Sequence, residues 1–193
     1  MLVNQASSSD IIGAAITRTV GAENKVAAGG VYTVQCIGAD GQVKWEESLK
    51  NLVVNVGLKD MNDKYFSGSS YTATWYIGLY GAAASNTPAA GDTAASHAGW
   101  TEITPYSNAT RPAATFAAAS TADPSVITNS ASPSAFTINA TATVGGAFLI
   151  SNNTKGGSTG VLFSASDFAA PGDRSVASGD QLNVTYTFSL DAA

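Results

Sequence analysis

Alternation of apolar and polar residues is clearest in the last third of the chain. From residue 182 to residue 190 every second residue is apolar, and asparagine, threonine and serine stand between them. The same period of two runs from Phe136 to Val144. Because successive side chains of a strand point to opposite faces, both stretches are predicted strands. In the last one the residues expected to face the core are Leu182, Val184, Tyr186, Phe188 and Leu190.

Two further segments have the composition of buried strands. Residues 31–37 and 42–46 are predicted to form a hairpin, with Asp40 and Gly41 supplying the turn. In this hairpin Cys36 falls on the apolar face and is expected to be a small core residue. The run from Trp75 to Tyr80 is rich in aromatic and β-branched residues, which favours a central strand.

One stretch has helical spacing. Leu58, Met61 and Tyr65 recur at intervals of three and four residues and predict one apolar stripe. Asn55 stands where an N-cap residue accepts backbone donors, and Gly68 follows the last periodic residue as a stop signal. The pattern therefore predicts one short helix over about residues 55–66.

Many strands, frequent turn signals and a single helix indicate a mainly β protein, an antiparallel β-sandwich or jelly roll. We assign the sandwich to residues 30–193 and an irregular N-terminal arm to residues 1–29. The arm contains Ile11, Ile12 and Ile16, which make it more apolar than expected for a segment exposed only to solvent. They are expected to bind a neighbouring subunit, with the arm pairing as a strand along the neighbour's sheet edge. The alternative is a loose terminus without a partner.

The composition of the chain argues against several classes of partner. Charged residues make up 12% of the chain, about half the usual share, and the net charge is −5. The nine basic residues are scattered, so nucleic acid is not an expected partner, because DNA binding needs clustered cations. No apolar run approaches the roughly 20 residues of a membrane span, so no membrane association is expected. One cysteine cannot form a disulfide within the chain.

A search for catalytic motifs finds none. The only histidine, His97, lies in a long loop without a motif. Glu102 together with an aspartate could form a pair of acid–base carboxylates, but any chain with 14 acidic residues allows that combination. The aspartates at 167, 173 and 180 are too far apart for a calcium loop, and each is expected to serve a turn. We therefore expect no enzyme, no catalytic residues, no metal ligands and no cofactor.

Aromatic residues are the remaining candidates for a binding surface. Around the loop 81–99 they could line a site for sugar, or they could pack in the core. The loop is long enough to be functional or mobile in its own right. The candidate residues are Trp75, Tyr76, Tyr80, Trp100 and Tyr106.

A set of short segments lies between residues 45 and 112: Trp45-Glu46, Asn51-Leu52-Val53, Gly57-Leu58, Thr74–Leu79, Gly91-Asp92-Thr93, Gly99–Glu102, Tyr106 and Arg111-Pro112. Together they resemble structural proteins of tailed bacteriophages, and the decoration (cement) proteins of short-tailed phages most of all. That resemblance implies a β-sandwich or jelly roll, a homo-oligomer (trimer or dimer), and binding to major capsid protein. It places the chain on the outer capsid surface of the virion after synthesis in the host cytoplasm, with no catalytic residues. Similar segments in tail and fibre proteins leave an alternative, a tail-fibre or receptor-binding module for host-surface glycan.

Overall fold

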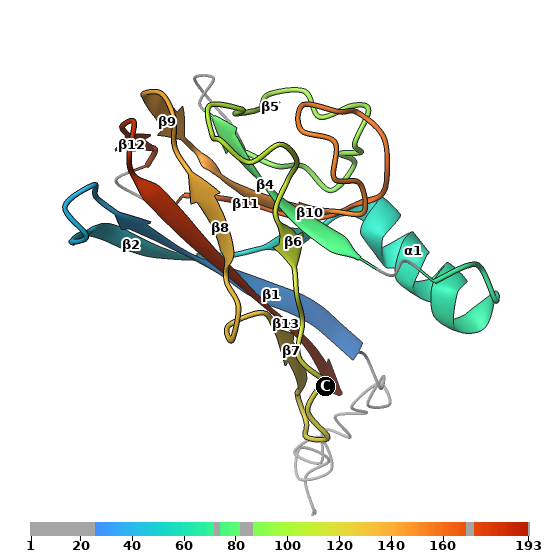
Figure 1. The fold of residues 1–193 in the computed structure, drawn as a ribbon. Helices are drawn as coiled ribbons and strands as arrows, with labels where there is room; N and C mark the ends of the chain where they lie inside the picture. Colours follow the sequence, from blue (N-terminus) through green and yellow to red (C-terminus); the bar gives the residue numbers. More distant parts are fainter. Residues whose placement is uncertain (1–25, 72–73, 82–86, 169–171, 193) are drawn as a thin grey trace, which may run out of the picture.

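The computed structural model describes residues 26–71, 74–81, 87–168 and 172–192. In this part of the chain two large antiparallel sheets pack face to face, with a third sheet of two strands and one helix, so the predicted β-sandwich is confirmed (Figure 1). The elements in chain order are β1 (Val26–Ile37), β2 (Val43–Lys50), β3 (Leu52–Val53), α1 (Asn55–Phe66), β4 (Trp75–Gly81), β5 (Thr101–Glu102), β6 (Ala113–Ala114), β7 (Ser125–Thr128), β8 (Ser134–Thr137), β9 (Ala142–Val144), β10 (Gly146–Ile150), β11 (Leu162–Asp167), β12 (Arg174–Val176) and β13 (Gln181–Ala192).

The first sheet, here called sheet I, is built on the first and last long strands. Its order is β2-β1-β13-β7, and β8 also pairs with β13. β1 and β13 pair along their full lengths, from Val26 opposite Ala192 to Ile37 opposite Gln181. The hairpin of β1 and β2 is confirmed, and β1 begins at Val26, so residues 26–29 of the expected arm belong to the sheet.

The second sheet, sheet II, has the order β3-β11-β10-β4-β5, and β6 also pairs with β4. The strand predicted from Trp75 to Tyr80 is confirmed as β4 (Trp75–Gly81), near the middle of this sheet. The core lies between the sheets and joins residues far apart in sequence. For example, the Tyr32 hydroxyl of sheet I lies 2.8 Å from Ser164 Oγ of sheet II.

The long strand predicted from Phe136 to Val144 is wrong. β8 ends at Thr137 in sheet I, and β9 begins at Ala142 and pairs with β12 instead. Between them the backbone bonds to loops: the N–H of Ile138 donates to Asp180 O and that of Asn139 to Pro105 O. Phe136, Ile138 and Val144 are buried on the two sides of this break, so the alternation reflects burial and carries no information on which strand is the neighbour.

The predicted core face of β13 is confirmed for its first half only. Leu182, Val184 and Tyr186 are buried, whereas Phe188 and Leu190 are half-buried. Phe188 lines a pocket between sheet I and α1, and only part of its side chain is enclosed by the core.

The helix has the predicted bounds, Asn55–Phe66, but two of its predicted details are wrong. Val54 is the N-cap residue and makes no side-chain cap hydrogen bond, because Asn55 already belongs to the first turn. Of the predicted apolar stripe Met61 packs against the core, whereas Leu58 is 41% exposed and Tyr65 is 84% exposed. Gly68 has φ +67°, which confirms it as the residue that ends the helix.

α1 packs on sheet II through Gly57, its one buried residue. A Cβ atom at this position would lie 2.4 Å from the carbonyl oxygen of Phe163 in β11. Only a residue without a side chain lets the helix backbone approach the strand backbone this closely.

We expect Gly57→Ala to lower the free energy of unfolding by about 1–3 kcal/mol, the usual cost of overpacking. Alanine elsewhere in a helix is favoured over glycine by about 1 kcal/mol, so steric conflict reverses the sign of the substitution here. Urea unfolding measures the effect, with the exposed Asn62→Ala in the same helix as the control. A stability equal to or above that of the wild type would show that the helix does not sit against β11 in this way.

Candidate functional site

Glu102 and Arg111 form a buried ion pair at the edge of sheet II. Arg111 Nη2 donates to Glu102 Oε2 at 2.6 Å, and Arg111 Nε donates to Glu102 Oε1 at 2.9 Å. The two side chains are 1% and 8% exposed. The guanidinium also donates to the carbonyl oxygens of Asn152 and Gly157, which ties the loop after β10 to this pair. Glu102 therefore bonds a cation through both carboxylate oxygens, and the hypothesis of Glu102 paired with an aspartate is not realised.

Trp100 organises the loop that precedes this pair. Its indole Nε1 donates to Asp92 Oδ2 at 2.9 Å, and its ring contacts Tyr80 and Phe148. His97 stacks on the same indole with the ring centroids 4.0 Å apart, and its Nδ1 lies 2.9 Å from the Trp100 carbonyl oxygen. Both contacts of His97 are with Trp100, so the only histidine has a structural role in this loop. The described part of the loop, residues 87–99, thus covers the outer face of sheet II.

The aromatic residues proposed for a sugar-binding surface do not form one together. Tyr80, Trp100 and Tyr106 are buried, with Tyr106 packed edge-on against Phe136 in the core. Trp75 and Tyr76 are half-buried. Core packing therefore accounts for three members of the set.

Asp180 serves a turn, as predicted. Its Oδ2 accepts the Ala177 N–H at 2.9 Å and the Lys44 ammonium at 2.7 Å, and Cys36 Sγ lies 3.8 Å away. Burial alone would raise the pKa of the Asp180 carboxyl, but Lys44 and the Ala177 N–H hold that pKa below its ordinary value. Burial and the Asp180 charge raise the pKa of the Cys36 thiol to about 11, so Cys36 stays protonated at neutral pH and is the predicted core residue.

Asp180 should make stability depend on acid pH. A carboxyl whose pKa is lower in the folded state stabilises the protein above its unfolded pKa, about 3.9, and that stability is lost as pH falls through the folded pKa. We expect wild-type protein to lose stability between about pH 5 and pH 2, and Asp180→Asn to be less stable at pH 7 with a flatter profile. Urea unfolding at stepped pH measures this, with the exposed Asp191→Asn as the control. Parallel profiles for wild type and Asp180→Asn would contradict the assignment.

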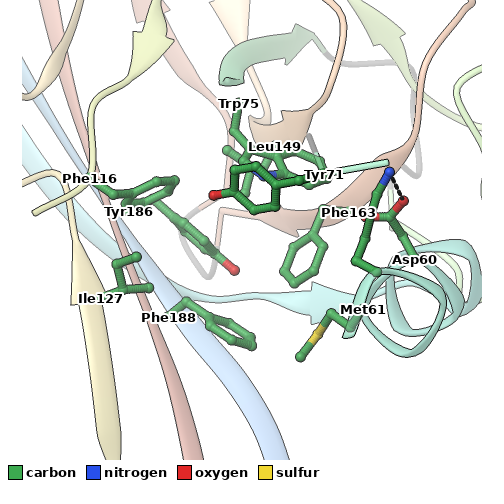
Figure 2. Close-up of a pocket in the computed structure, with 11 residues that line it drawn as sticks. Asp60, Met61, Tyr71, Trp75, Phe116, Ile127, Leu149, Phe163, Tyr186 and Phe188 are labelled. Atoms are coloured by element: carbon green, nitrogen blue, oxygen red, sulfur yellow. Dashed lines mark ion pairs between the residues drawn. The ribbon is translucent and has the colours of Figure 1, made fainter. Parts of the chain in front are cut away.

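An open pocket of about 220 Å³ lies where sheet I, sheet II and α1 diverge; we call it the aromatic cleft. Its walls are predominantly apolar and come from both sheets and the helix. The rings of Phe163 and Phe188 pack edge to face there, with their centroids 5.4 Å apart (Figure 2). The lining residues are Asp60, Met61, Lys64, Tyr71, Trp75, Phe116, Ile127, Leu149, Phe163, Tyr186 and Phe188.

The charges at the mouth of the cleft are paired. Lys64 Nζ lies 3.6 Å from Asp60 Oδ1 one helical turn away, and it also donates to the Ser70 carbonyl oxygen. The cleft therefore presents apolar surface with no net charge of its own, which suits an apolar occupant more than an ionic one.

Three aromatic side chains at the end of α1 are largely exposed. Tyr65, Phe66 and Tyr71, here called the aromatic tip, are 84%, 78% and 81% exposed. Tyr65 and Phe66 contact each other edge to face, and Tyr71 also lines the aromatic cleft. Helical spacing predicted Tyr65 on a buried stripe, and no pattern predicted the tip. The signal available was the adjacent pair Tyr65-Phe66, since neighbouring residues of a helix cannot share one buried face.

The predicted partner-binding residues Ile11, Ile12 and Ile16 lie outside the described residues. Within the described ranges no group of three histidine, cysteine or acidic residues is placed to hold a metal ion. The helix that the structure describes is too short to cross a bilayer.

Some of the sequence segments singled out between residues 45 and 112 meet in space. Asp92 and Trp100 are joined by a hydrogen bond, Glu102 pairs with Tyr80 in the sheet register, and Arg111 bonds Glu102. These residues belong to sheet II and its covering loop, whereas Trp45 and Glu46 lie in β2 of sheet I and Trp75 lines the aromatic cleft. No model of a protein family matches the chain, and neither a curated protein nor a solved structure matches it.

Proposed function

We propose that this chain is a structural protein of a tailed-phage virion that binds the outside of the capsid shell as a decoration protein and stabilises it. The resemblance to phage structural proteins motivates this function, and four of the residues that carry it, Asp92, Trp100, Glu102 and Arg111, bond one another in sheet II and its covering loop. The proposed partner is major capsid protein, and the proposed state is a homo-oligomer on the virion surface.

The aromatic tip is the observation that carries the proposal. Large aromatic side chains that are four-fifths exposed cost solvation free energy in a lone molecule, and grouped apolar surface marks protein contacts. Tyrosine and phenylalanine are enriched in the buried centres of interfaces, where charged residues are depleted. With few charges in the chain, a contact at the tip can bury area without isolating a charge.

Shell stabilisation follows from mass action. A ligand that binds the assembled shell and has no affinity for the dissociated subunits stabilises the shell in proportion to the logarithm of its concentration over Kd. Many identical sites on one shell multiply that effect. Binding at the aromatic tip would in this way strengthen the capsid against the pressure of packaged DNA.

Reconstruction of virions by electron cryo-microscopy tests the location. We expect density for the sandwich on the outer capsid surface in copy numbers proportional to the capsid protein, and a few copies confined to the tail would contradict the proposal. Purified Tyr65→Ser/Phe66→Ser protein should bind capsids that lack the protein at least tenfold more weakly than wild type. The control is Val43→Ser, which removes an apolar side chain that is 55% exposed on β2.

A tail-fibre or receptor-binding module for glycan is a second candidate. It is favoured by Tyr71 and Trp75, whose rings line the aromatic cleft beside the polar groups of Asp60 and Lys64. Aromatic faces next to polar side chains can hold a sugar ring. A glycan array and binding to host cells separate the candidates: sugar binding that Trp75→Ala abolishes favours this one, and capsid binding without any glycan signal rejects it.

A further inference from the structure

One side of β1 lacks a partner strand over its first residues. β13 pairs with all of β1 from Val26 onward, but on the opposite side β2 pairs only from Val31 onward, where Val31 lies opposite Lys50. After Lys50 the chain leaves sheet I, with the Asn51 N–H donating to the Gly30 carbonyl oxygen and Asn51 Nδ2 donating to the Tyr186 hydroxyl. Residues 26–29 therefore present an edge that no strand of the described residues covers, here called the free edge of β1.

The free edge adjoins the aromatic cleft. Gly30 lies opposite Phe188, a cleft residue, and a Cβ on Gly30 would meet the Tyr186 side chain, so this face of β1 is the cleft face. By alternation Ala28 and Val26 share that face, and Val26 is 69% exposed. Backbone donors and acceptors thus lie beside an uncovered apolar surface, which is the combination that strand addition uses.

We propose that the free edge of β1 and the aromatic cleft together bind residues 11–16 of a neighbouring copy of this chain, which adds to sheet I as a strand. Twenty-five residues precede Val26, and the chain enters sheet I at the cleft end of β1. This contact between copies is independent of the proposed attachment to a capsid, because each copy supplies both the strand and the receiving edge.

The sequence 11–16 fits this site in spacing and chemistry. In a strand Ile12, Ala14 and Ile16 point to one face and Ile11 to the other. Six residues of strand span about 20 Å, enough to cover the free edge and reach the cleft. A cavity of about 150 Å³ accepts a benzene-sized group, so the 220 Å³ cleft has room for branched aliphatic side chains. The segment carries no charge, which matches the paired charges at the mouth.

The connection favours a neighbouring copy over the same chain. Nine residues, 17–25, separate Ile16 from Val26. β-hairpins usually turn in two to five residues, and this connector lacks the Asn-Gly or Asp-Gly pair typical of such turns. Exchange between copies needs no tight turn.

Light scattering on the full chain tests the occupant. Wild-type protein should have a mass of two or more times the single-chain mass of 19.5 kDa. Ile12→Asn/Ile16→Asn should fall to the single-chain mass at the same concentration. Ile11→Asn, on the opposite strand face, is the matched control and should keep the oligomer. A monomeric wild type, or an unchanged mass in the double variant, would overturn the proposal.

Disulfide trapping tests the site and tells the two copies apart. Tagged Ile12→Cys protein mixed with untagged Met61→Cys protein should give a mixed disulfide-linked dimer under mild oxidation. Ser175→Cys, exposed on β12 at the other end of the sandwich (Figure 1), replaces Met61→Cys as the control and should give at least tenfold less. No mixed dimer above this control overturns the proposal. A second sample is a single chain that carries both Ile12→Cys and Met61→Cys. If the disulfide forms only within that chain, the occupant is the chain's own segment and the proposal is also overturned.

Discussion

Replacing Arg111 with methionine is expected to lower the free energy of unfolding by about 3–5 kcal/mol, the cost of breaking a buried ion pair from one side. Glu102 would keep its charge in a site where its side chain is 8% exposed and would lose both guanidinium donors. The carbonyl oxygens of Asn152 and Gly157 would lose a donor at the same time. Thermal and urea unfolding measure the loss.

A second substitution separates the lone charge from the lost packing. Arg111→Met/Glu102→Leu removes both charges and should recover a large part of the stability, since buried pairs can be replaced by apolar groups at little cost. If Arg111→Met costs about 1 kcal/mol or less, the pair behaves as an exposed one and the buried geometry is wrong.

Phe136→Ala is expected to cost about 3–5 kcal/mol, the range for removing a fully buried phenylalanine. Phe136 is completely enclosed, faces Leu182 across the β8–β13 pair, and packs edge-on against Tyr106 with the ring centroids 5.1 Å apart. Removing the ring would leave a closed cavity that neighbouring strands cannot fill. Urea unfolding with an unchanged m-value would assign the loss to stability alone.

Phe188→Ala is the matched control on β13. Its ring is half-buried and lines the open aromatic cleft, so its removal enlarges a space that already opens to solvent. Its cost should be clearly below that of Phe136→Ala. Equal losses for the two variants would show that the cleft end of the sandwich is closed in solution.

Candidate sites were harder to predict from the sequence than the fold. Of the five aromatic residues selected for a binding surface, Trp75 lies in the aromatic cleft, whereas Tyr80, Trp100 and Tyr106 are buried. Hydrophobicity cannot separate an aromatic residue of the core from one that lines a cleft, because both favour apolar surroundings.

The sequence by itself determined the local elements. The period of two in residues 182–190, the Asp40-Gly41 turn and the helix end at Gly68 depend on backbone geometry within a few residues, and each is present in the structure. The burial of Cys36 followed from the same alternation. These features need no knowledge of the rest of the chain, because side-chain direction and turn conformation are set locally.

Only the tertiary structure decided which faces meet. The backbone of β11 lies against Gly57 of α1, and of the predicted stripe Met61 packs on the core while Leu58 and Tyr65 are exposed. The strand from Phe136 divides after Thr137, because Ile138 and Asn139 bond to loops that the sequence places far away. β13 pairs with β1 from Val26 onward, whereas β2 pairs with it only from Val31 onward. Among the described residues this difference leaves the free edge of β1. Each depends on contacts between segments distant in sequence, and local periodicity carries no record of the partner.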